Sequence, residues 1–198
     1  MRNRSILILV GPSAVGKTTV ANELVKSYGC FSFIRSLTTR PPRGDGNDDE
    51  YLYTTREGFL HEVECGGVLE HTEYDGTLYG TPRSEIERIF SDGKIPLLVL
   101  DINGARSLTE RGGDFSTCAL YLTEDEAVLK ERLEKRYLSG DDKDAQRYES
   151  RMARNAWERE NLPSLSQLFF RTVPGESTPE LTAKSVLSIF REFTENDE

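Results

Sequence analysis

A glycine-rich segment near the start of the chain has the residue types and the spacing of a phosphate-binding loop. It satisfies the pattern G-x-x-x-x-G-K-[ST] in full, through Gly11, Pro12, Ser13, Ala14, Val15, Gly16, Lys17 and Thr18. Such glycines let successive backbone N–H groups converge on one anion, and a following helix adds the positive end of its dipole. Lys17 can reach the outer phosphates of a nucleoside triphosphate, and the Thr18 hydroxyl can ligate Mg²⁺. We therefore predict nucleotide binding by this segment and by Thr19 directly after it, although the pattern does not define the reaction.

A second basic group follows on a polar stretch of the chain. Arg35, Arg40 and Arg43 lie within nine positions of one another. A guanidinium group suits two-point binding of a phosphate. These residues alone leave two interpretations open: a second phosphate site, or a basic loop that is simply solvated.

The elements expected around the glycine-rich segment decide its interpretation, because eight-residue patterns also occur by chance. Ser5–Val10 is a continuous apolar run, typical of a central parallel strand that is buried on both faces. Lys17–Val25 has the character of a helix. The other expected elements of this kind are strands at Ile95–Leu100 and Cys118–Leu122, and a helix from the capping box Thr123–Glu126 to about Arg136. This alternation predicts an α/β fold with a central, mostly parallel sheet flanked by helices.

The middle of the chain departs from this alternation. Residues 37–50 are rich in Pro, Gly, Asp and Asn, which predicts a long loop. A helix is expected after it with Thr81 as N-cap and Pro82 at its first position. The short strand candidates are Tyr51–Tyr53, Val68–His71 and Leu78–Tyr79. We therefore predict a small, partly β insertion over about residues 34–90.

The second half of the chain has a polar break at residues 139–144, between two helices that carry many arginines. This pattern predicts a mobile lid over about residues 137–148. A last helix is expected from about Thr178–Pro179. We predict one domain over residues 1–198, with a core formed by about 1–33 and 91–198.

Composition narrows the classes of function. The 198 residues include 25 Lys+Arg and 34 Asp+Glu, a formal charge of −9, with 36% hydrophobic and 30% charged residues. An acidic chain is unsuited to bulk binding of nucleic acid or anionic lipid. The chain has three cysteines and no C-x-x-C pair, which favours reduced thiols. No apolar run is long enough to span a membrane as a helix. We expect a soluble cytoplasmic protein that binds neither nucleic acid nor membrane and is a monomer or a homodimer.

Several segments in the same order resemble those of guanylate kinases. Residues 36–45, followed by Glu50-Tyr51, are similar to the family's segment for the nucleoside monophosphate. Residues 70–81 fit the family pattern E-x-x-x-[YF]-x-G-x-x-Y-G-[TS]. With the phosphate loop and Leu100-Asp101-Ile102, the resemblance spans at least residues 6–106. It implies a P-loop nucleotide kinase fold with an insertion that binds the nucleoside monophosphate, and a lid.

The resemblance also implies the residues of an acceptor site. They are Arg40, Arg43, Tyr51 and Tyr79 for the acceptor phosphate, and Ser36, Glu70 and Thr81 for guanine, with Gly80 as a further substrate-binding residue. Guanine has two adjacent donors, N1–H and the 2-amino group, which the Glu70 carboxylate can accept together. Its O6 suits a hydroxyl such as that of Thr81 or Ser36. Adenine lacks those donors and would leave Glu70 unsatisfied.

One segment departs from the family pattern. The family usually continues D-[IV]-D-x-Q-G, whereas this chain has Asp101-Ile102-Asn103-Gly104. Asp101 closes a buried strand, so it is interpreted either as a residue near the Mg²⁺–phosphate region or as a helix N-cap. Asn103 can still accept a hydrogen bond from guanine but brings no charge.

Three arginines resemble the lid arginines of nucleoside-monophosphate kinases: Arg132, Arg136 and Arg151. The stretch between the last two is longer than expected, so Arg147 and Arg154 are alternatives. All of them could instead pair with glutamates on the same helices.

Together these features predict Mg²⁺-dependent transfer of the γ-phosphoryl group of ATP to GMP, and to dGMP. The catalytic candidates are Lys17, Arg40, Arg43, Arg132, Arg136 and Arg151, with Thr18 and Asp101 as metal ligands. No general base is required, because the attacking phosphate oxygen is already ionised. His61 and His71 are interpreted as structural or surface groups. Two alternatives stay open: a kinase of the same fold for another phosphorylated acceptor such as ribose 1,5-bisphosphate, and a silent guanylate-kinase-like interaction module.

Overall fold

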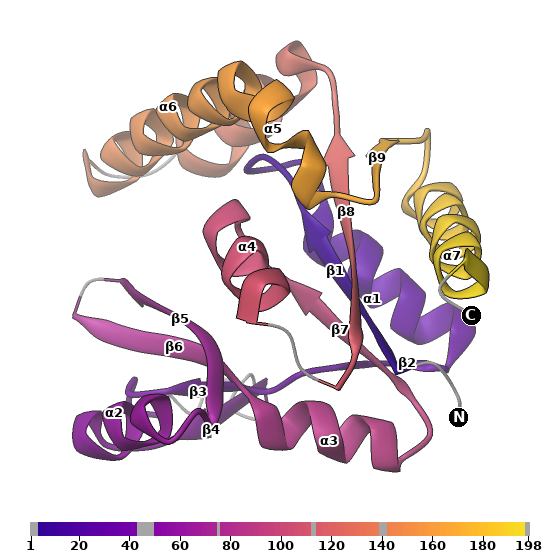
Figure 1. Ribbon diagram of the computed structural model, residues 1–198. Coiled ribbons are helices and arrows are strands. Elements are labelled where there is room, and N and C mark those ends of the chain that lie inside the picture. The colour runs from indigo at the N-terminus through magenta and orange to yellow at the C-terminus, as the bar shows by residue number, and fades with distance from the viewer. Residues whose placement is uncertain (1–3, 43–49, 75, 112–113, 139–141, 197–198) are drawn as a thin grey trace.

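The structure is a computed structural model that describes residues 4–42, 50–74, 76–111, 114–138 and 142–196. It has the expected α/β architecture, in which a parallel sheet carries helices on both faces and a second, smaller sheet lies beside it (Figure 1). Arg43 and the centre of the expected lid, residues 139–141, lie outside the described residues.

The main sheet has the strand order β2-β7-β1-β8-β9, and every neighbouring pair in it is parallel. Its strands are β1 (Ser5–Val10), β2 (Phe31–Phe33), β7 (Ile95–Val99), β8 (Ser116–Thr123) and β9 (Arg171–Pro174). The apolar strand β1 is central, and all six of its residues are buried. The phosphate loop therefore starts at the carboxyl end of a fully buried strand, where open α/β sheets bind ligands.

Alternate residues of β1 pack into two different cores. Leu7 and Leu9 pack with helices α1 (Lys17–Tyr28) and α7 (Pro179–Asn196). Ile6 and Ile8 pack on the other side with α4 (Ile102–Arg111). The side chains of a strand alternate between the two faces of a sheet. Because helices cover both faces here, the residues on both sides of β1 need to be apolar.

The smaller sheet has the strand order β4-β3-β6-β5 and mixed direction. Its strands are β3 (Ser36–Thr38), β4 (Tyr51–Tyr53), β5 (Val68–Tyr74) and β6 (Thr77–Pro82). Helix α2 (Arg56–Glu64) covers it through Phe59, which packs with Val68 and Leu78. The expected β insertion is thus present, and α3 (Arg83–Ser91) leads from it back to β7.

Two arginine-bearing helices complete the fold, α5 (Glu126–Tyr137) and α6 (Asp142–Leu165), and a short 3₁₀ turn (Ser166–Leu168) follows them. In Figure 1 they lie at the end of the main sheet opposite the smaller sheet, with α4 between the two parts. Residues 142–148, expected in the lid, belong to the first turns of α6.

Three local expectations were wrong. Thr81 is not an N-cap: it lies in β6 opposite Glu70, and α3 begins at Arg83 with Pro82 as its N-cap. The N-cap of α5 is Asp125, whose carboxylate accepts the N–H of Ala127 at 2.8 Å, so the capping box Thr123–Glu126 does not form. Strand β3 occupies the start of the loop expected at 37–50. For Thr81 and for β3, pairing with a strand distant in the sequence decides the structure. For α5, the carboxylate of Asp125 is better placed to cap the helix than the residue expected from the sequence.

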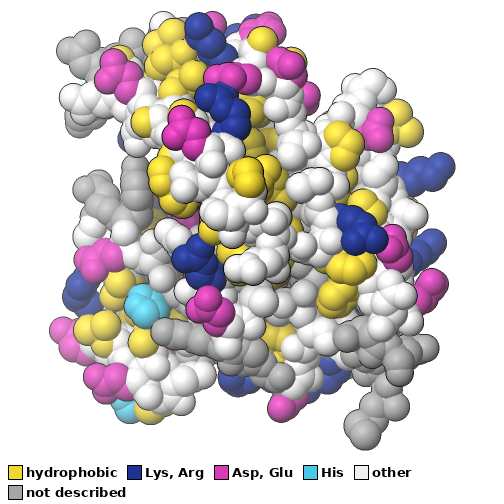
Figure 2. Space-filling view, turned by 45° about the horizontal axis from the view of Figure 1, so that its top comes forward, with side chains coloured by type: hydrophobic (Ala, Val, Ile, Leu, Met, Phe, Trp, Pro, Cys, Tyr) yellow, Lys and Arg dark blue, Asp and Glu magenta, His cyan; other side chains and the backbone are white. Residues whose placement is uncertain are grey.

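The described surface carries no large basic patch on the face seen in Figure 2, where Lys and Arg side chains are interspersed with Asp and Glu. None of the described helices combines the length and the apolar character that crossing a membrane demands.

Candidate active site

The phosphate loop joins β1 to α1 through backbone angles that require glycine. Gly11 has φ of 145°, and a Cβ on it would lie 2.5 Å from the carbonyl oxygen of Leu122. Gly16, directly before α1, has φ of 101°. Ala14 also has a positive φ, of 68°, which is uncommon for a residue with a side chain. The loop therefore has a shape that other residue types could adopt only with strain.

Lys17 folds back over this loop. Its Nζ donates hydrogen bonds to the carbonyl oxygens of Gly11, at 2.7 Å, and Pro12, at 3.0 Å. Burial lowers the pKa of Lys17 to about 8; the charge of Glu158 opposes this shift, and those of Arg154 and Arg151 add to it. The lysine thus lies at the loop among charged groups of α6.

This pKa predicts a pH dependence for nucleotide binding. Lys17 binds phosphate only when protonated, and above pH 8 the neutral form predominates in the free protein. Binding of ATP must then be coupled to proton uptake, so its dissociation constant should rise above pH 8 by up to about ten-fold per pH unit. Calorimetric titration of ATP between pH 7 and 9.5, in buffers of different ionisation enthalpy, measures both effects. A dissociation constant that stays flat to pH 9.5 contradicts the prediction, and Lys17→Met should remove the dependence.

The side chains of α5 and α6 bind the same loop from outside. Arg132 donates to the carbonyl oxygens of Ala14 (3.2 Å) and Val15 (3.5 Å), and pairs with Glu124 at 3.1 Å. Asn155 accepts the N–H of Ser13 at 2.7 Å and donates to its carbonyl oxygen at 3.1 Å. The Ser13 N–H thus faces α6 in this structure, although the sequence predicts that it binds phosphate.

Asp101 joins α4 to α6. Its Oδ1 accepts the N–H of Gly104 at 2.7 Å, as an N-cap does, and its Oδ2 pairs with Arg154 at 3.0 Å. Arg154 also pairs with Glu158 at 3.1 Å, and the buried Glu158 accepts the hydroxyl of Tyr121 at 3.2 Å. The N-cap interpretation of Asp101 is therefore confirmed, while its role toward a metal ion stays a prediction.

Several of the residues expected to bind the acceptor phosphate form a cluster of tyrosine rings and one arginine at the smaller sheet. The guanidinium of Arg40 lies over the ring of Tyr51, 4.7 Å from its centroid, and donates to the hydroxyl of Tyr53 at 3.4 Å. The rings of Tyr51 and Tyr79 meet edge to face, with centroids 6.2 Å apart. Arg40, just after β3, is therefore a neighbour of Tyr51 in β4 and of Tyr79 in β6, as the resemblance implies. Tyr53 was not among the expected residues.

The residues expected to read guanine also converge. Glu70 is 6% exposed, and its Oε1 accepts the hydroxyl of Thr81 at 2.6 Å. Gly104 lies against the same carboxylate, since a Cβ on it would be 3.2 Å from Glu70 Oε2. The first turn of α4 therefore adjoins Glu70, and Asn103 in that turn is exposed. Gly80 is close-packed, because a Cβ there would lie 2.8 Å from the Glu70 carbonyl oxygen.

A cleft of about 610 Å³ connects the two halves of the site. Thr18, at the end of the phosphate loop, lines one side, and the residues on the other include Ser36, Tyr51 and Thr81. Thr18, which is predicted to bind the donor, thus shares one opening with three residues that are predicted to bind the acceptor.

Arg35, the first arginine of the basic stretch, has a structural partner. It binds both carboxylate oxygens of Glu85, at 2.6 and 3.0 Å, and Arg88 binds the same carboxylate at 3.0 Å. Burial alone would raise the pKa of Glu85, but the hydrogen bonds from the two arginines outweigh it and lower the pKa to about 2. The contacts of Arg35 therefore support a role in anchoring α3.

The five lid candidates have different surroundings. Arg132 contacts the phosphate loop, and Arg151 and Arg154 are close enough to Lys17 to lower its pKa. Arg136 is exposed and stacks on Tyr137, 5.4 Å from the ring centroid, and Arg147 pairs with Asp144 at 2.9 Å. The arrangement favours Arg132, Arg151 and Arg154 over the other two as groups near the phosphates.

A second cavity beside the phosphate loop was not expected from the sequence. It measures about 240 Å³, and its lining includes Val15, Arg132 and the segment 175–179 between β9 and α7. Residues 175–179 match no recognised sequence motif. They are distant from the phosphate loop in the sequence, and only the folded chain brings the two segments together. Within the described ranges, no three or more His, Cys, Asp or Glu side chains cluster as a metal site would require.

Comparison with known proteins agrees with this geometry. Residues 3–161 match the family model described as guanylate kinase. The chain is similar to the guanylate kinase of Lactobacillus delbrueckii subsp. bulgaricus, with 39% identity over 69% of this chain and 68% of the relative. The match to the guanylate kinase of Lactobacillus johnsonii has 38% identity over 52% of each chain. The crystal structure of guanylate kinase from Anaplasma phagocytophilum superposes with a TM-score of 0.68 at 25% identity, covering 98% of this chain and 88% of that one.

Proposed function

This chain belongs to the guanylate kinase family, and we propose that it transfers the γ-phosphoryl group of ATP to GMP through the cleft between the phosphate loop and the smaller sheet. The observation that carries this proposal is the shared opening itself. Thr18 faces it from the donor side, and Ser36, Tyr51 and Thr81 face it from the acceptor side. A kinase requires two phosphate sites that face each other, so that reacting groups are aligned before transfer.

ATP is the donor in this proposal. Its phosphates bind backbone N–H groups of residues 11–19 other than that of Ser13, which donates to Asn155, together with the positive N-terminal end of α1 and Lys17. The cavity that adjoins the loop, between Arg132 and residues 175–179, has the room and position to receive its base. Lys17 now bonds to two loop carbonyls, and it would exchange these bonds for phosphate oxygens.

GMP is the acceptor. Glu70 has its carboxylate oriented by the Thr81 hydroxyl and lies next to the first turn of α4. A buried carboxylate held in this way suits the adjacent N–H donors of guanine. Arg40, Tyr51 and Tyr79 would hold the 5′-phosphate, and we include Arg43 among these groups from the sequence alone.

Catalysis then consists mainly of alignment and neutralisation of charge. The two nucleotides bring phosphates that repel each other, and cationic side chains from three directions offset that repulsion. They are Lys17 of the phosphate loop, Arg40 in the segment after β3, and Arg132 and Arg151 of α5 and α6. Arg136 stays a weaker candidate because its guanidinium stacks on Tyr137, whereas that of Arg132 contacts the phosphate loop. Closure of a lid over residues 137–148 would exclude water, which otherwise competes as the acceptor.

The residues at the end of β7 and the start of α1 fit a Mg²⁺ ion that is held mainly by phosphate. Mg²⁺ in kinases is usually bound by one or two protein oxygens together with phosphate oxygens and water, so a cage of carboxylates is not needed. The Thr18 hydroxyl and the Asp101 carboxylate are the candidate oxygens. When bound, the ion neutralises negative charge on the transferred group. Because Asp101 also pairs with Arg154, its contribution to the metal competes with that ion pair.

A coupled assay of ADP release tests the proposal across five acceptors: GMP, dGMP, AMP, UMP and ribose 1,5-bisphosphate. We expect GMP to be the best substrate, with dGMP also accepted, because no proposed contact requires the 2′-hydroxyl. A preference for ribose 1,5-bisphosphate would point to the alternative kinase. No turnover with any acceptor would favour the silent module. A cytoplasmic location and a monomeric or homodimeric state remain predictions.

A further inference from the structure

We propose that Asn155 of α6 is a positioning residue, which fixes the shape of the phosphate loop by holding the backbone of Ser13. This inference rests on the proposed function of the loop in binding ATP. It concerns a residue that no sequence motif includes.

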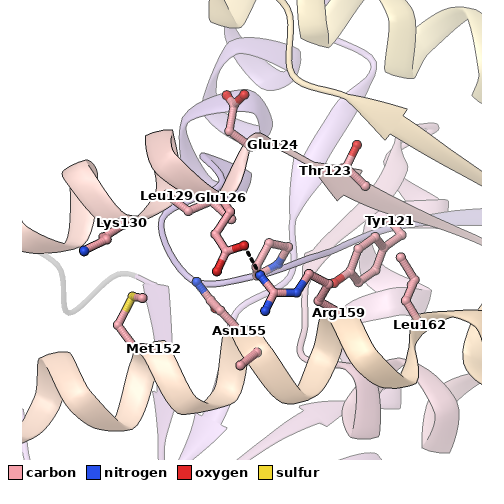
Figure 3. Close-up of a pocket in the computed structure, with 12 residues that line it drawn as sticks. Tyr121, Thr123, Glu124, Glu126, Leu129, Lys130, Met152, Asn155, Arg159 and Leu162 are labelled. Carbon is pink, nitrogen blue, oxygen red and sulfur yellow. Dashed lines mark ion pairs between the residues drawn. The ribbon is translucent and has the colours of Figure 1, made fainter.

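The contact is specific to an amide side chain. Asn155 Oδ1 accepts the N–H of Ser13 at 2.7 Å, and Asn155 Nδ2 donates to the carbonyl oxygen of the same residue at 3.1 Å. One side chain therefore binds both polar groups of one backbone residue, 142 positions away in the sequence. Figure 3 shows Asn155 projecting from α6 toward the loop. Aspartate has the same shape but lacks the donor, and alanine lacks both groups.

The contact of Asn155 lies in a part of the loop whose backbone shape is constrained. Ser13 directly precedes Ala14, whose positive φ of 68° has an energetic cost that the surroundings must offset. Arg132 binds the carbonyl oxygens of the next two residues, Ala14 and Val15. Side chains of α5 and α6 thus bind three consecutive loop residues immediately before Gly16 and Lys17, so the direction of the following N–H groups depends on them.

Helix α6 is itself anchored on both sides of Asn155. Arg154 pairs with Asp101 at the end of β7, and Glu158 accepts the hydroxyl of Tyr121 in β8. Tyr121 belongs to the main sheet, and Asp101 follows directly after its strand β7. These contacts therefore fix the position of Asn155 relative to the same sheet from which the phosphate loop begins.

The test uses Asn155→Ala with Asn161→Ala as a matched control. Asn161 is on the same helix, and its amide donates to the carbonyl oxygen of Trp157 one turn earlier rather than to the loop. We expect Asn155→Ala to weaken ATP binding about ten-fold, because a loop that is no longer held in shape must be ordered when ATP binds. Calorimetry with MgATP measures the dissociation constant without turnover. In steady-state assays KM for ATP should rise by a similar factor, while KM for GMP changes less than two-fold.

Two further measurements separate positioning from a merely structural role. The melting temperature and the emission of Trp157, the single tryptophan of the chain, should stay close to wild type in Asn155→Ala. Asn155→Asp keeps the shape of the side chain and should weaken ATP binding at least as much, because its second oxygen faces the Ser13 carbonyl. It also provides the readout if the alanine variant does not fold.

The inference is overturned if both Asn155 variants bind ATP as wild type does. It is equally overturned if KM for both nucleotides and the melting temperature change together, since the residue would then support the fold generally. If wild-type protein binds ATP but phosphorylates none of the acceptors, the proposed function fails, while the calorimetric comparison still tests Asn155.

Discussion

Replacing Lys17 with alanine will lower kcat for GMP phosphorylation by about 10²–10³-fold. This corresponds to about 3–4 kcal/mol of transition-state stabilisation, the typical cost of removing one preorganised donor from a site where negative charge is reorganised. Lys17 is the cation that the phosphate loop itself supplies, and its Nζ lies within hydrogen-bond distance of two loop carbonyls. Phosphate oxygens that enter the loop would take the place of those carbonyls as its acceptors.

The measurement is kcat for ADP release at saturating ATP and GMP, with Lys26→Ala as the matched control. Lys26 is on the same helix, but its side chain is 79% exposed and pairs only loosely with Glu23, at 3.8 Å. We expect the control to retain wild-type kcat. Near-normal turnover of the Lys17 variant would mean that the phosphoryl group is transferred without this lysine, and the proposed mechanism would have to be abandoned.

The loop itself could be predicted from the sequence because its chemistry depends on local features. Gly11 and Gly16 are needed for backbone angles, and Lys17 and Thr18 act at fixed distances along the chain from them. The central strand Ser5–Val10 was equally clear, because a strand buried on both faces needs apolar residues throughout. Features of this kind are encoded within about a dozen residues.

Other parts of the site depend on partners far away in the sequence. Thr81 could equally have been a helix cap, and only the pairing of β5 with β6 brings its hydroxyl to Glu70. Arg35 has the residue type of a phosphate ligand, yet Glu85, 50 positions later, engages it. Asn155 was missed because its partner is a backbone group, which leaves no pattern of side chains to recognise.

The resemblance to a family supplied what local chemistry could not. Without it, Glu70 has the pattern of an ordinary strand carboxylate, and a solvated surface group is the simpler interpretation. In the structure Glu70 is buried, accepts a hydroxyl and adjoins Gly104. A desolvated carboxylate beside the acceptor cleft has a cost that recognition of a ligand can offset. Burial therefore supports the proposal that the choice of base depends on Glu70.

Glu70→Gln should reduce the preference for GMP over AMP by about 10- to 100-fold. A hydrogen bond to a charged group contributes about 1.5–3 kcal/mol, which is the range of that loss. The glutamine amide can still accept the Thr81 hydroxyl through its oxygen, but its NH₂ group would face the donors of guanine rather than accept them. The effect should therefore appear as a fall in kcat/KM for GMP, with little change for AMP.

The measurement is the ratio of kcat/KM values for the two nucleotides, with Glu73→Gln as the matched control. Glu73 is in the same strand, but it is exposed and pairs with Arg56 at 3.1 Å, so the control should keep the wild-type ratio. Unchanged selectivity in the Glu70 variant would mean that guanine is read elsewhere, and Asn103 in the first turn of α4 would be the next residue to replace. Because Asn103 carries no charge, most of the discrimination is expected from Glu70.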